Sequence, residues 1–153
     1  MFLNTLPTKE QLLNRNVALQ ADQQRYALET IHHVIFSCCY VNRVWKQWLQ
    51  LLQSPSPLCH VAFTNFLAPP SIISSKEQTE RWWVWWAAMC WYTWKMRNQC
   101  VFEQGQFDGH KLGQQVLMFS WSWLSAFNNS FSYSFTQWQL NIGLCLLGSR
   151  AYE

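Results

Sequence analysis

Charged residues are scarce in this chain. Of its 153 residues, only 12% are Asp, Glu, Lys or Arg, about half the share typical of a soluble domain. Half of the residues are hydrophobic and 17% are aromatic. A chain of this length and composition can form one domain with a large core, but its surface would be poorly solvated. We therefore expect a partner that covers part of the surface, or else marginal solubility. The net charge of +3 does not by itself indicate nucleic-acid binding.

The residues and motifs of common enzyme classes are also missing. Asp22 and Asp108 are the only aspartates, so the acidic clusters used in two-metal phosphoryl chemistry cannot be assembled. No G-x-S-x-G, P-loop or H-E-x-x-H motif occurs. Cys38 and His33 lack an evident third group to orient them as a nucleophile and base. The sequence predicts a protein that is not an enzyme.

The cysteines form no regular framework. Six are present and none belongs to a C-x-x-C pair. The first residues do not combine a basic start with an apolar run, as a secretory signal would. We therefore expect reduced thiols in an intracellular protein, in the nucleus or the cytoplasm. The longest uncharged tryptophan-rich run, 82–94, is shorter than the roughly 20 residues that span a bilayer, so we expect no membrane partner.

Tryptophan is abundant where charge is missing. Six of the eleven tryptophans lie in 81–102, and a helical wheel of this stretch is apolar nearly all round. Such a helix is buried centrally when it does not cross a membrane. One side of the wheel carries Trp82, Trp85, Trp86, Met89, Thr93, Met96 and Cys100. The other side carries Val84, Ala87, Trp91, Trp94 and Phe102. We predict that this helix, starting at Ser75 or Thr79, is the centre of the core.

The remaining patterns complete an all-α prediction. Helical periodicity is expected after a Thr8 cap, over 28–39, over 41–52, and from Asp108 to about Phe127. The apolar side of 28–39 carries Leu28, Ile31, His32, Ile35, Phe36 and Cys39. The apolar stripe of the helix after Asp108 carries Leu112, Val116, Phe119, Trp123 and Ala126. Alternation at 131–136 indicates a short strand or extended arm. We expect five or six helices packed on the tryptophan helix, with a short extended C-terminal segment. The regions are 1–53, a Pro/Ser-rich connecting loop at 54–75, and 76–153 within the same compact unit.

Four motifs occur in order along the chain. They are LPTKEQLL at 6–13 with Arg15 beyond it, the E-T-x-x-H-x-x-F-x-C core from Glu29 to Cys38 followed by Trp45, WKMRNQCVF at 94–102, and W-x-x-N-x-x-x-C-L at 138–146. Together they resemble the reverse-transcriptase zinc-binding domain toward the C-terminus of plant LINE-type (non-LTR) retrotransposon polyproteins. The resemblance implies a truncated, degenerate copy of that domain, without the polymerase, whose ancestral task was binding element RNA or DNA.

The metal site implied by this resemblance is C-x-x-C followed by H-x-x-x-x-C, which suits tetrahedral zinc. His33 and Cys38 stand at its last two positions. The first pair should fall near Ala21 and Gln24, where no cysteine occurs. Two ligands do not make a structural zinc site, so we expect no cofactor, with zinc as the alternative. Replacement ligands would have to come from His32, Cys39 or Asp22.

The helical wheel separates the two neighbouring histidines without reference to the family. His32 falls among Leu28, Ile31 and Ile35, so it is the one expected to be partly buried. His33 falls on the polar side, where either a ligand or a plain surface histidine would lie.

Two functions remain open from the sequence. A retrotransposon remnant with weak binding to RNA or single-stranded DNA would use Arg43, Lys46, Lys95 and Arg97, and these cations, with Arg15 and Arg25, should converge on one face. The simpler interpretation is structural. Arg43 and Lys46 would then form the solvated face of their helix, and Arg97 would lie near the helix C-terminus with its guanidinium stacked on a tryptophan. The second function is a helical protein-interaction or scaffold module, or a chain without a selected function, with scattered cations and an exposed apolar patch.

Overall fold

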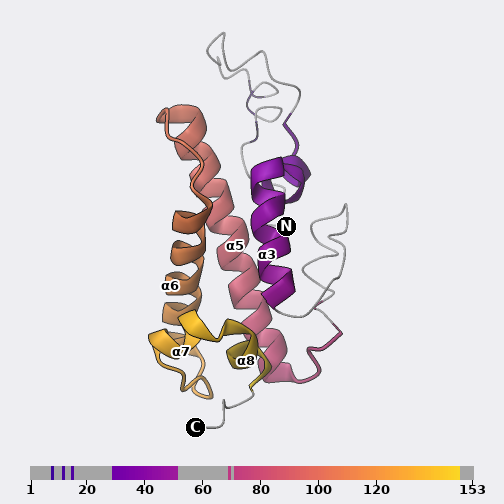
Figure 1. Cartoon of the computed structure of the whole chain (residues 1–153), viewed down its shortest axis with the longest axis vertical. Coiled ribbons are helices and arrows are strands. Elements are labelled where there is room, and N and C mark those ends of the chain that lie inside the picture. Colours follow the sequence, from indigo (N-terminus) through magenta and orange to yellow (C-terminus); the bar gives the residue numbers. More distant parts are fainter. Residues whose placement is uncertain are drawn as a thin grey trace.

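The computed structural model describes residues 8, 12, 15, 29–51, 69 and 71–148. In these ranges it contains helices and no strand, so the all-α prediction is confirmed. The elements are η2 (His33–Ser37), α3 (Cys39–Leu51), α5 (Lys76–Phe102), α6 (Gly109–Phe127), α7 (Phe135–Leu140) and α8 (Ile142–Leu147). In Figure 1, helix α5 runs along the molecule between α3 and α6, α8 lies across its N-terminal part, and α7 packs on α6.

Helix α5 starts at a complete capping box. The Ser75 hydroxyl accepts a hydrogen bond from the Gln78 backbone N–H at 3.2 Å, and the Gln78 side chain accepts one from the Ser75 N–H at 3.1 Å. Of the two starts open from the sequence, Ser75 and Thr79, the structure uses Ser75 because this reciprocal pair satisfies two otherwise free N–H groups. The helix ends at Phe102, where the Glu103 N–H still bonds to the Gln99 carbonyl.

One side of α5 is buried as the helical wheel predicts. Its core side chains are Trp82, Trp85, Trp86, Met89, Thr93 and Met96. Cys100, predicted on the same side, is only half-buried. The opposite side differs from the prediction of an all-round buried helix, because Trp91 is 46% exposed and Phe102 is 52% exposed. Neighbouring helices cover only part of the circumference of α5, so a helix that is apolar on every side leaves an apolar surface.

A π-helical turn shifts the helical register before α3. The Cys38 N–H bonds to the His33 carbonyl, five residues earlier, at 2.8 Å. Each such turn contains an extra residue and rotates the residues beyond it relative to a 3.6-residue wheel. The wheel placed Cys39 on the apolar side, whereas Cys39 is exposed and Val34 is buried instead.

Helix α6 begins as expected, because the Asp108 carboxylate accepts the Lys111 backbone N–H at 3.0 Å. Of its predicted apolar stripe, only Leu112 and Val116 are buried. The buried face consists of Leu112, Val116, Leu117, Ser120 and Leu124, while Phe119, Trp123 and Ala126 are exposed. Ser120 can be buried because its hydroxyl donates to the Val116 carbonyl at 2.6 Å and accepts from Trp138 Nε1 at 3.1 Å.

The C-terminal segment is extended over a shorter range than 131–136. Ser134 forms a second capping box with Gln137, so α7 starts at Phe135. Arg81 of α5 is buried beneath this region. Its Nη1 donates to the Cys145 carbonyl at 3.0 Å, and its guanidinium lies 5.5 Å from the Tyr133 ring centroid. These contacts join the start of α5 to α8 and to the segment before α7.

Little of the expected N-terminal helix falls within the described residues. Thr8 is buried, and its carbonyl accepts the Leu12 N–H at 2.8 Å, the spacing of one α-helical turn. Most of the connecting loop at 54–75 and the expected boundary between 1–53 and that loop lie outside the described residues. Among the helices that are described, none has the length and apolarity needed to cross a membrane.

Thr93→Val is expected to stabilise the protein by about 1 kcal/mol. Thr93 is 1% exposed, and its hydroxyl has no hydrogen-bond partner among the described residues. Valine has nearly the same shape and removes this buried polar group. Urea unfolding followed by far-UV circular dichroism would show a higher midpoint. A lower midpoint would mean that the Thr93 hydroxyl is satisfied in the folded protein.

Candidate functional site

The two remnant ligand positions lie at opposite ends of the π-helical turn. His33 is exposed and His32 is half-buried, as the wheel predicts. The His32 ring contacts Phe36, with centroids 5.7 Å apart. Cys38 is half-buried and packs against the core. In the part of the chain that the structure describes, no three His, Cys, Asp or Glu side chains gather as a metal site would require. Asp22 and the region of the missing cysteine pair lie outside that part.

Arg97 forms an ion pair. Its Nε and Nη2 donate to the two carboxylate oxygens of Glu29 at 2.6 and 2.5 Å, and both side chains are about one-tenth exposed. The guanidinium also lies 5.3 Å from the Trp94 ring centroid and donates to Asn98 Oδ1 at 2.9 Å. The expected stacking on tryptophan is present. Most of the donor capacity of Arg97 is therefore directed at groups of the chain itself.

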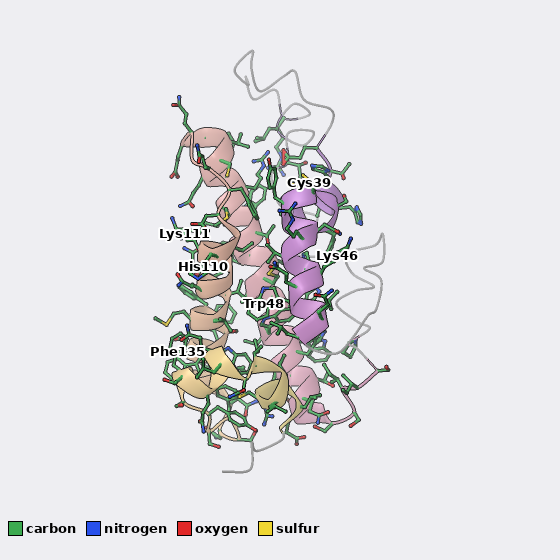
Figure 2. The ribbon with its side chains drawn as sticks, in the orientation of Figure 1. Cys39, Lys46, Trp48, His110, Lys111 and Phe135 are labelled. Carbon is green, nitrogen blue, oxygen red and sulfur yellow. The ribbon has the colours of Figure 1, made fainter. Side chains whose placement is uncertain are left out.

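The other three candidate cations are exposed but lie on two different surfaces. Arg43 and Lys46 are on the side of α3 opposite its buried face, and Figure 2 shows Lys46 at the edge of α3 that faces away from α5 and α6. Lys95 is on α5, with its Nζ 5.9 Å from the Tyr92 ring. Tyr92 in turn packs on Phe119 of α6. The structure brings Arg43 and Lys46 together, but it does not gather them with Lys95 and Arg97.

An apolar groove lies between α5 and α6. Its volume is about 440 Å³, and it is lined by Ala87, Ala88, Trp91, Tyr92, Phe119 and Trp123. Within this lining the Tyr92 and Phe119 rings pack on each other, with centroids 4.8 Å apart. Phe119 and Trp123 are 44% and 52% exposed. The groove is open because the two alanines on α5 are too small to fill the space between the surrounding aromatic rings.

Charged side chains lie beyond the two ends of the groove on the same stripe of α5. Glu77, Glu80, Val84, Ala87, Trp91 and Lys95 follow one another at spacings of three or four residues, so they share one side of the helix. Glu80 accepts a hydrogen bond from Asn128 at 3.3 Å and lies 3.9 Å from Lys76. The stripe is therefore acidic at its N-terminal end, apolar in the middle and basic at Lys95.

The buried thiols are not prepared for nucleophilic chemistry. Burial raises the pKa of Cys90 well above its usual value. It also raises the pKa of Cys145 to about 11, although the nearby Arg81 charge acts in the opposite direction. Both groups are therefore protonated at neutral pH, and a thiol is a far weaker nucleophile than a thiolate.

The groove was only partly visible in the sequence. Ala87 and Trp91 fall on the second side of the α5 wheel, and Phe119 and Trp123 fall in the expected α6 stripe, but both sets were assigned to the core. A signal was present on α6, where Leu117, Ser120 and Leu124 form an alternative stripe that is more completely buried. Because Ser120 is polar, this stripe does not stand out as an apolar pattern in the sequence.

Comparisons with known proteins do not assign this chain to a family. No protein-family model, no curated protein and no solved structure matched this chain.

Proposed function

We propose that this chain is a non-catalytic helical interaction module whose α5–α6 groove binds the apolar face of a helix on a partner protein. The observation that carries the proposal is an apolar groove of about 440 Å³ bordered by exposed aromatic rings. Exposed apolar surface of this kind marks sites of protein association. Helices commonly bind in such grooves through residues spaced three and four apart.

The resemblance to the reverse-transcriptase zinc-binding domain is compatible with this role. We propose that the chain descends from a retrotransposon polyprotein and has kept the helical fold around the former metal region. Neither zinc nor a catalytic residue is part of the proposed role. The aromatic groove would be the surface that once faced the rest of the polyprotein or that now faces a separate protein.

A second candidate function is weak nucleic-acid binding retained from the same ancestor. The observation that favours it is the exposure of Arg43 and Lys46 on neighbouring turns of α3. Two cations can contact a phosphate backbone, but this is fewer than the six to ten phosphate contacts that give strongly salt-dependent binding. The groove therefore supports protein binding better than the cations support nucleic-acid binding.

The two candidates can be separated by direct binding. The probe is a fluorescent synthetic peptide with leucine at heptad a and d positions and glutamine elsewhere, measured by anisotropy against nanomolar to micromolar protein. We expect Trp123→Glu to weaken peptide binding at least tenfold, since it places a charge in the groove. Leu140→Glu is the matched control, because Leu140 is 73% exposed on α7, and it should leave the affinity unchanged.

The second measurement uses labelled oligouridine at two salt concentrations. RNA binding that falls steeply with salt and is lost in Arg43→Glu/Lys46→Glu would favour the nucleic-acid candidate. Peptide binding that is equally affected by Trp123→Glu and Leu140→Glu, or that is absent at every concentration, would contradict the groove proposal.

A further inference from the structure

The stripe of charged and apolar residues on α5 is complementary to itself when two copies of the helix run antiparallel. When α5 is placed antiparallel to a copy of itself, with the centre between Ala87 and Ala88, positions at equal distances from that centre meet. Val84 then meets Trp91 of the second copy, Glu80 meets its Lys95, and Glu77 meets its Asn98. The small residues lie at the crossing point, where two helix backbones approach most closely.

We infer that the partner in the groove is a second copy of this chain, bound through an antiparallel, two-fold symmetric α5–α5 contact. This inference rests on the proposed function of the groove. In a two-fold contact the same patch is used on both subunits, so the patch must complement itself. The stripe meets this condition because it is acidic at one end and basic at the other, with Glu80 and Lys95 about 22 Å apart at 1.5 Å per residue.

The side chains of the stripe are accessible for such a contact. Trp91 and Lys95 are exposed, and the Glu80 side chain is 42% exposed while bonded to Asn128 and near Lys76. Lys95 lies beside the Tyr92 ring at the basic end of the groove. Antiparallel association therefore places an ammonium and a carboxylate together twice, once at each end of the contact.

The aromatic surface is large enough to form the centre of a dimer interface. The exposed parts of Trp91, Phe119 and Trp123 provide on the order of 300 Å² of apolar area, given that an aromatic side chain has 150–250 Å² in all. A standard interface buries roughly 800 Å² on each partner, with an apolar centre and a polar rim. The charged ends and the flanking turns of α5 and α6 supply that rim. In this register Trp91 of one copy packs on Val84 of the other, next to the Ala87 and Ala88 that line its groove.

Exchanging the charges at Glu80 and Lys95 tests this inference on the full chain, with dimerisation measured by sedimentation equilibrium. We expect a dimer at micromolar concentration. Lys95→Glu and Glu80→Lys should each weaken it about tenfold, since each creates two like-charge contacts. The double variant Lys95→Glu/Glu80→Lys should return the dissociation constant to within about threefold of the original, because both contacts again join opposite charges. Lys46→Glu, on the outer side of α3, is the matched control and should leave dimerisation unchanged.

A variant within the apolar centre completes the test. Trp91→Glu should give a monomer whose circular dichroism spectrum matches that of the original chain. A monomer at every concentration, or a dimer in which the double variant is as weak as the single ones, overturns the inference. In either case, peptide binding that is sensitive to Trp123→Glu would still support the groove as a binding site for a different protein or an apolar ligand. Loss of the dimer and of peptide binding together would contradict both proposals.

Discussion

Trp45→Ala is expected to lower the free energy of unfolding by about 4 kcal/mol. Trp45 is fully buried on α3, between Phe36 at 5.5 Å and the edge-on ring of Trp85 at 5.7 Å, measured between ring centroids. Its Nε1 also donates to the Ile35 carbonyl at 2.6 Å. Alanine would leave a cavity where α3, η2 and α5 meet and would leave that carbonyl without its partner. Since single domains are stable by only about 5–15 kcal/mol, this loss brings the fold close to unfolding.

Two further variants separate the contributions of the Trp45 side chain. Trp45→Phe keeps an aromatic ring in the core but removes the indole N–H, so we expect a cost of about 1–2 kcal/mol. Trp123→Ala is the matched surface control, because Trp123 is 52% exposed, and we expect less than about 1 kcal/mol. Urea unfolding monitored by far-UV circular dichroism measures all three. Similar losses for Trp45→Ala and Trp123→Ala would contradict the assignment of Trp45 to the core.

Glu29→Ala is expected to destabilise the protein by about 3 kcal/mol. The substitution leaves the Arg97 guanidinium largely buried against Trp94 and Phe102 without its carboxylate partner. An unpaired buried charge is costly because it has lost water on folding and gained no opposite charge. The same ion pair connects a residue before the π-helical turn to the C-terminal half of α5, so its loss would also loosen that connection.

The control for Glu29→Ala is a pair of comparisons in the same urea experiment. Glu29→Leu/Arg97→Met removes both charges and should recover most of the stability, since apolar residues can replace a buried ion pair at little cost. Lys76→Ala breaks the exposed contact with Glu80, where the side chains are 86% and 42% exposed, and should cost under about 0.5 kcal/mol. A Glu29→Ala cost as small as that of Lys76→Ala would mean that the Arg97 ion pair contributes nothing measurable.

The local features of the fold were predictable from short sequence patterns. Asp108 before α6 forms the cap expected from its side chain, and Ser75 begins the tryptophan helix as one of two expected starts. Which residues of α5 share one side also follows directly from its 3.6-residue periodicity. These features depend on residues close together in the chain, so the sequence contains the required information.

The features that failed depend on contacts between distant segments or on an interrupted helix. An uninterrupted helical wheel puts Cys39 on the apolar side, whereas the π-helical turn at His33–Ser37 rotates the register and Cys39 is exposed. Phe119 and Trp123 were placed in the core because they are apolar, whereas Ser120 is buried instead through its bond from Trp138. A serine becomes a core residue when a distant group satisfies its hydroxyl, and no local pattern reports that.

In the candidate site, too, local patterns were predictable from the sequence and contacts between distant segments were not. From the sequence Arg97 is a candidate phosphate contact, whereas in the structure its bidentate ion pair joins it to Glu29, 68 positions away. Conversely, the residues of the groove were recognised as apolar and were expected to be covered. Arg97 and Lys95 are two residues apart on α5, yet Arg97 is paired with Glu29 and largely buried while Lys95 is exposed, because among the described residues only Arg97 meets a distant carboxylate.

By itself the sequence determined that the chain is helical, that α6 begins after Asp108, and that its longest helix is apolar on every side. Only the tertiary structure decided which apolar side of α5 is buried and which forms a groove. The physical reason is that periodicity defines the sides of a helix, whereas burial depends on how many neighbours pack around it. In Arg81–Phe102 the number of apolar side chains exceeds the number that the neighbouring helices cover, and exposed Trp91 is one of those that line the groove.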